Sequence, residues 1–146
     1  MKPQGESPRS TVTLWICLIL IALAGCEDST NSPTELASNA PVVAVVPNAF
    51  TYVMFGDNFT ASVNYDLSFT TDSLVYSMVV AKFGGGSATF TVWDASGNNV
   101  LRDSVFTTKV NTVVQSGKGI PKLCTLRFQN FSGQMTLSFA ANKGAH

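Results

Sequence analysis

The sequence predicts an all-β domain built as an antiparallel, two-sheet β-sandwich. Residues 41–146 are rich in Thr, Ser, Val, Phe and Asn and contain no Glu, and this composition favours strands and turns over helices. Strand-like runs alternate with turn signals at a spacing of roughly 8–12 residues, which is typical of sandwiches and barrels. No window of useful length has a helical period.

Strand-like runs follow one another along this domain, and we expect eight or nine strands from them. The first run is β-branched and bounded by prolines, and the second ends at the turn signal GDN. The run over 73–83 is apolar on both faces, so we expect a central strand that is covered on both sides. The runs are residues 41–48, 49–55, 58–69, 73–83, 87–94, 99–107, 111–115, 123–129 and 133–141.

Two hairpins are predicted from turn chemistry. Three glycines at 84–86 join two strong runs and adopt positive φ freely, so we expect a hairpin there. The segment DASGNN joins the run that ends at Trp93 to the next one, and Gly97 and Asn98 suit left-handed positions.

Alternation along the later runs predicts which side chains are buried. Side chains on a strand point to opposite faces in turn, so each run divides into an apolar and a more polar face. The faces that we expect in the core are Ala88, Phe90 and Val92; Cys124, Leu126 and Phe128; and Met135, Leu137 and Phe139. Thr89, Thr91 and Trp93 share the face opposite Phe90, and Thr125 and Arg127 the face opposite Leu126.

The N-terminal segment has the pattern of a secretory signal. Lys2 and Arg9 precede an unbroken apolar run over residues 14–23. At 1.5 Å rise per residue this run is too short to cross a hydrocarbon core of ~30 Å. A short apolar core after a basic start and before small residues predicts export.

The signal ends in Leu23, Ala24, Gly25 and Cys26, which closely resembles the lipobox of bacterial lipoproteins; the resemblance covers residues 1–26. It implies cleavage before Cys26, a diacylglycerol thioether on the Cys26 sulfur, and a fatty acyl group such as palmitate on the new amine. A thiolate is a good nucleophile for receiving a lipid. Two or three chains give a firm membrane anchor, whereas one holds only marginally.

Three segments are therefore expected: a signal peptide over 1–25, the lipidated cysteine with a flexible tether over 26–40, and a β-sandwich over 41–146. The tether is polar, with Pro33 within it and Pro41 directly after it. The acidic pair Glu27 and Asp28 fits either a surface-export signal or a solvated linker. We expect a location in the cell envelope outside the cytoplasm, at the outer membrane or the cell surface.

The sequence contains few of the side chains that catalysis commonly uses. The single histidine is His146, and the apolar phase of Cys124 predicts a buried structural thiol. The domain's carboxylates are all Asp, and four of the five stand in turn-like contexts; they are Asp57, Asp66, Asp72, Asp94 and Asp103. An EF-hand does not fit at Asp94, because glycine is misplaced and the final glutamate is missing. We expect no enzyme activity, no metal and no cofactor.

Trp93 is the candidate ligand contact. An aromatic ring on a Thr-lined sheet face can stack on a sugar ring or another flat ligand, and it can equally be a residue packed under a loop. Lys109, Lys118 and Lys122 lie near the loop SGKGIPK and fit either anionic ligands or a solvated loop. The formal net charge is zero, so no overall field points to nucleic acid.

The domain resembles the immunoglobulin-like and jelly-roll-like sandwiches of carbohydrate-binding and adhesion modules, but it lacks their Cys–Trp–Cys signature. This resemblance implies a non-catalytic binding or adhesion module for an unknown protein or glycan, held at the membrane through Cys26. The alternative is a structural or assembly lipoprotein with a protein partner, which an apolar exposed sheet edge or patch would favour. A small hydrolase is the third class.

Overall fold

The computed structural model describes residues 37–142. This part of the chain is made of strands and their connections, so the predicted all-β class is confirmed. The strands are β1 (Val42–Val46), β2 (Ala49–Asp66), β3 (Leu74–Trp93), β4 (Asn99–Val105), β5 (Lys109–Gln115) and β6 (Leu123–Ala141).

Several predictions concern residues outside the described part of the chain. The lipobox residues Leu23, Ala24, Gly25 and Cys26 belong to this group, as does His146. Between residues 37 and 142, no helix has the length and apolar character needed to span a membrane.

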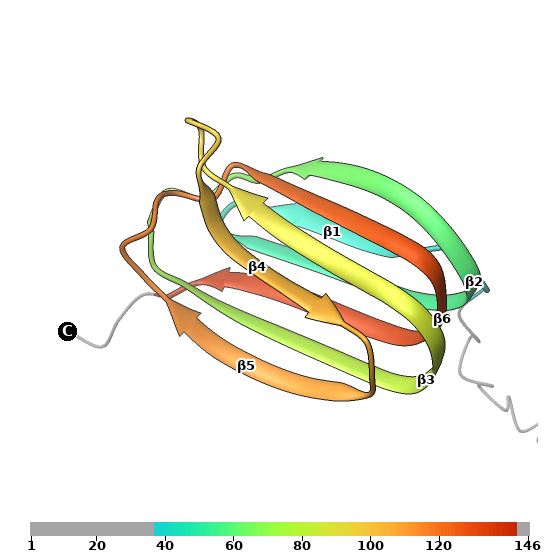
Figure 1. Ribbon diagram of the computed structural model, residues 1–146. Coiled ribbons are helices and arrows are strands. Elements are labelled where there is room, and N and C mark those ends of the chain that lie inside the picture. Colours follow the sequence, from blue (N-terminus) through green and yellow to red (C-terminus); the bar gives the residue numbers. More distant parts are fainter. Residues whose placement is uncertain (1–36, 143–146) are drawn as a thin grey trace, which may run out of the picture. The chain divides into compact units, whose positions relative to one another are not determined.

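All six strands join one antiparallel sheet in the order β1-β2-β6-β3-β4, and β5 pairs with another part of β3. The prediction of eight or nine strands was therefore wrong in number. Each of β2, β3 and β6 is a single long strand that contains two of the expected runs (Figure 1).

The expected breaks in these long strands are bends and not turns. The pairing register of β2 with β6 shifts after Gly56, and that of β3 with β6 shifts around Gly85. The hairpin expected at 84–86 is absent, because β6 pairs with β3 on both sides of the glycines. Gly86 has φ +76° and lies against the backbone of Asn130, where a side chain would not fit. Glycine thus permits the bend without ending the strand.

The bends fold the sheet into two facing layers (Figure 1). The first layer contains β1, β5 and the segments 49–56, 74–81 and 133–141; the second contains β4 and the segments 59–66, 87–93 and 123–131. The sandwich arrangement is therefore built from one continuous sheet, whereas two sheets were expected.

The core lies between the two layers and is largely aromatic. Phe139 in the first layer stands 5.6 Å from Phe90 in the second, and Tyr52 stands 5.9 Å from Phe128, measured between ring centroids. The predicted inward faces of the three later runs are all buried. The run over 73–83 was expected to be covered on both faces, and this was wrong. The segment 74–81 is central in its layer, but its outer face is open to solvent, since Val79 is 39% exposed.

Candidate functional site

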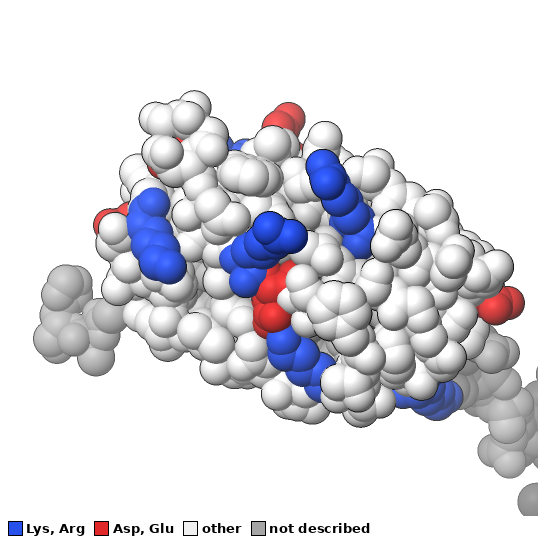
Figure 2. All heavy atoms as spheres, viewed as in Figure 1, with Lys and Arg blue, Asp and Glu red and all other residues white. Residues whose placement is uncertain are grey.

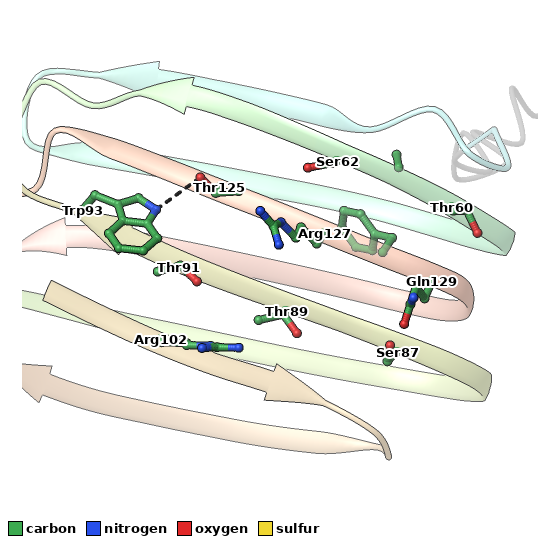
Figure 3. Close-up of a pocket in the computed structure, with 12 residues that line it drawn as sticks. Thr60, Ser62, Ser87, Thr89, Thr91, Trp93, Arg102, Thr125, Arg127 and Gln129 are labelled. Atoms are coloured by element: carbon green, nitrogen blue, oxygen red, sulfur yellow. Dashed lines mark hydrogen bonds between the residues drawn. The ribbon is translucent and has the colours of Figure 1, made fainter. Parts of the chain in front are cut away.

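A groove crosses the outer face of the second layer, over β2, β6, β3 and β4 (Figure 3). Its volume is about 680 Å³. Most of its lining is polar and uncharged, and it contains one indole and two guanidinium groups; the lining residues are Thr60, Ala61, Ser62, Ser87, Thr89, Thr91, Trp93, Arg102, Thr125, Arg127, Phe128 and Gln129. Strand alternation explains this composition, because the apolar residues of the same strands point into the core.

Trp93 stands at one end of the groove and is half-buried. Its indole Nε1 donates a hydrogen bond to Thr125 Oγ1 at 3.3 Å, so the ring is oriented by the neighbouring strand (Figure 3). The backbone is held as well, since Lys122 N donates to Trp93 O at 2.8 Å. The predicted ligand-contact residue therefore occupies a fixed position in this groove.

Hydroxyl side chains continue from Trp93 along the groove floor. Thr91, Thr89 and Ser87 follow on β3, with Thr125 beside Thr91 on β6. From residue 87 to residue 93 the floor is roughly 20 Å long at about 3.3 Å per residue. The hydroxyl groups provide a row of hydrogen-bond donors and acceptors, with the flat indole ring of Trp93 at one end.

Two arginines flank this floor from opposite sides. Arg127 on β6 pairs across the sheet with Thr89, and Arg102 on β4 pairs with Thr91. Both are exposed, and no carboxylate lines the groove. Within residues 37–142 the single ion pair joins Lys109 to Asp103, so both guanidinium groups lack an acidic partner there. Figure 2 shows several basic side chains on a largely uncharged surface, two of them beside an acidic side chain.

Asp103 lies on the opposite side of β4 from Arg102 and belongs to a separate polar cluster. Its carboxylate accepts hydrogen bonds from Lys109 Nζ at 2.6 Å and from Tyr76 Oη at 3.1 Å. Burial by itself raises the pKa of Asp103, but the hydrogen bonds from Lys109, Ser104 N, Asn111 and Tyr76 outweigh it and hold the pKa below its ordinary value. Burial, followed by the nearby Asp103 charge, raises the pKa of Tyr76 to about 12. These hydrogen bonds join Asp103 on β4 to residues of β5 and β3.

The three lysines near the SGKGIPK loop do not form a common site. Lys109 is paired with Asp103, and Lys122 Nζ donates to Phe69 O at 2.9 Å. Lys118 is exposed in the loop. An anion-binding role for these residues as a group therefore has no geometric support.

Cys124 and Asp94 have the structural roles expected of them. Cys124 is fully buried, and burial raises the pKa of its thiol to about 12. Asp94 accepts hydrogen bonds from the backbone N atoms of Ser96 and Asn98, both at 2.8 Å, and closes the β3–β4 hairpin. This hairpin was predicted correctly. Among the described residues, no three His, Cys, Asp or Glu side chains converge on a possible metal position.

The outer face of the first layer has a different character, because it carries no charge. Three cross-strand rows of five residues cover β1, β2, β6, β3 and β5, and all of them are Val, Ala, Thr or Ser: Val42, Val53, Thr136, Val79 and Val110; Ala44, Thr51, Ser138, Ser77 and Thr112; Val46, Ala49, Ala140, Val75 and Val114. The valines at its edges are strongly exposed, with Val110 at 76% and Val42 at 57%. We call this surface the uncharged face.

Sequence reasoning identified Trp93 but missed the two arginines as parts of the same site. From the sequence, Arg127 was placed on the face opposite Leu126 but Arg102 was assigned no face, although alternation along residues 99–107 would have put Arg102 opposite Leu101. Their convergence depends on the pairing of β6 and β4 with β3, which the run pattern does not encode.

Comparisons with known proteins do not assign the chain to a family. No family model matches it, and no curated protein matches it. Among solved structures, it is similar to a subunit of the disulfide-linked pili of Bacillus endospore appendages, at 13% identity over 68% of this chain and 91% of that chain (TM-score 0.37). It is also similar to the SPBc2 prophage-derived protein YomS, at 12% identity over 67% and 96% (TM-score 0.40). A third similar structure is ligand-free CBM1 of BiXyn10A, at 14% identity over 69% and 89% (TM-score 0.33). Likeness at this level carries no argument about function.

Proposed function

We propose that the chain is a lipid-anchored bacterial lipoprotein whose β domain is a non-catalytic binding module for a glycan. The groove over Trp93 supports this proposal most strongly. It combines an oriented, half-buried indole with a row of hydroxyl side chains, and rings of this kind stack on sugar rings while hydroxyls bind their polar edges.

Binding of the purified full-length chain to an immobilised glycan panel tests this role. Trp93→Ala should weaken binding about tenfold through the loss of stacking, and Trp93→Phe should retain much of it. Phe106→Ala is the matched control, because Phe106 is 70% exposed and lies outside the groove. Equal binding by Trp93→Ala and wild type, with unchanged thermal unfolding, would exclude the groove.

The lipid anchor is supported by the lipobox-like sequence that ends at Cys26. Cys26→Ser should release the protein from the membrane fraction or leave it as an unprocessed precursor, because serine cannot form the thioether. A variant that matures and remains anchored like wild type would contradict the proposal. Protease treatment of intact and lysed cells then distinguishes the cell surface from an internal location in the envelope.

A second candidate function is assembly with a protein partner in the cell envelope. The uncharged face supports it, because exposed apolar patches at a sheet surface commonly mark protein interfaces. Val110→Lys should abolish crosslinking to a partner or a second copy, whereas Ile120→Lys, in the loop before β6, should not. Absence of any crosslinked species in wild-type cells would leave the glycan-binding role as the better account.

A further inference from the structure

We infer that the ligand of the groove is an acidic polysaccharide, with carboxylate or sulfate groups that are bound by Arg102 and Arg127. This inference rests on the proposed function and specifies the class of glycan. Its basis is the placement of two arginines, without acidic partners among the described residues, in a groove that otherwise carries no charge.

The positions of the two arginines suit an extended ligand. They lie on strands that flank β3 on either side, and their cross-strand partners on β3 are Thr89 and Thr91. With strands about 4.8 Å apart and residues about 3.3 Å apart, their Cα atoms are separated by roughly 12 Å. Figure 3 shows Arg127 and Arg102 on either side of the segment that carries Trp93, Thr91 and Thr89. A glycan chain that follows β3 from Trp93 would therefore pass between the two arginines.

Charge complementarity favours an anionic chain over a neutral one. The nearest acidic neighbour in sequence, Asp103, points away from the groove and is already paired with Lys109. Nothing in the groove lining therefore offsets the positive potential of Arg102 and Arg127. A guanidinium group binds carboxylate and sulfate oxygens with two parallel hydrogen bonds, which a neutral hydroxyl cannot match in strength.

The experiment compares the full-length chain on three glycan classes of similar length: carboxylated, sulfated and neutral. Arg102→Gln and Arg127→Gln are the test variants, and Lys118→Gln is the control because it removes one exposed positive charge outside the groove. We expect binding to an acidic class, with a loss of about three- to tenfold for each arginine variant. Lys118→Gln should bind like wild type.

Salt dependence gives a second readout that a purely structural role of the arginines would not produce. Affinity for the acidic glycan should fall between 0.1 M and 1 M salt, where the Debye length decreases from about 10 Å to about 3 Å. The arginine variants should show a shallower salt dependence than wild type.

The outcomes separate this inference from the proposed function. Binding of neutral glycans as strongly as acidic ones, with Trp93 required and the arginines dispensable, would overturn the inference and keep the binding module. No binding to any class would overturn both. Equal, arginine-dependent binding of single-stranded DNA would overturn the inference too, since it would indicate general attraction of polyanions.

Discussion

The bend in β3 makes Gly86→Ala the most informative stability variant. Gly86 has φ +76°, and an added Cβ would overlap the backbone of Asn130 and Gln129 on the paired strand β6. The positive φ alone costs a residue with a side chain about 1–2 kcal/mol. Relief of the overlap requires the two backbones to move apart, at a further cost of about 1–3 kcal/mol. We therefore expect a loss of about 3 kcal/mol in the free energy of unfolding.

Gly97→Ala is the matched control. Gly97 has φ +79°, close to that of Gly86, but an added Cβ would meet nothing within 4 Å. Only the backbone term of about 1–2 kcal/mol applies. The two variants should therefore differ by about 2 kcal/mol, and this difference isolates the close contact between β3 and β6 at the bend.

Urea denaturation of a chain that begins at residue 37 measures both variants. With a slope of about 1–3 kcal/mol per molar, a difference of 2 kcal/mol separates the midpoints by roughly 1 M. Equal losses for the two variants would refute the reasoning, because they would mean that the strands do not approach each other at Gly86.

Three further predictions concern the described polar groups. Asp103→Asn should cost about 1–3 kcal/mol near neutral pH, because it removes the negatively charged partner of Lys109. The pKa of Asp103 in the folded state lies below its ordinary value of 3.8. The ionised carboxylate therefore stabilises the fold above pH 3.8, and this stabilisation is lost as the pH falls through the folded-state pKa. The free energies of unfolding of wild type and Asp103→Asn, measured in urea, should therefore converge in acid. Cys124, buried and with its pKa raised to about 12, should resist iodoacetamide in the folded chain from residue 37 and react after unfolding; rapid labelling without denaturant would contradict its burial. Asp94→Ala should speed amide exchange of Ser96 and Asn98, whose backbone N atoms donate to the Asp94 carboxylate; unchanged exchange there would show that the carboxylate does not hold the turn.

The faces of the strands could be predicted from sequence because alternation is a local property. Phe90 and Val92 are buried while Thr89 and Trp93 lie on the outer face, as the pattern indicated. Alternation has a period of two residues, so a short run is enough to divide a strand into its faces. Apolar character was a poorer guide to burial than alternation. Both faces of the run over 73–83 are apolar, yet Val79 on its outer face is open to solvent.

The turn signals were found correctly but were partly misinterpreted. Glycine at 84–86 and the Asp94 segment both permit positive φ, yet the first is a bend and the second a hairpin. A bend and a hairpin differ in what the following residues pair with. After the glycines, β3 continues along β6, whereas after Asp94 the chain reverses and pairs with β3 itself.

The all-β class, the inward faces of the later strands and the turn at Asp94 could be predicted from the sequence, because they depend on composition, alternation and side-chain hydrogen bonds within a few residues. The bending of three long strands into two layers, and the groove that Trp93, Arg102 and Arg127 share, became evident from the folded structure. Those features depend on pairing between segments far apart in the chain. A shift of two residues in that pairing would leave Arg127 on the outer face but would move it away from Thr89, and alternation within one strand does not exclude such a shift.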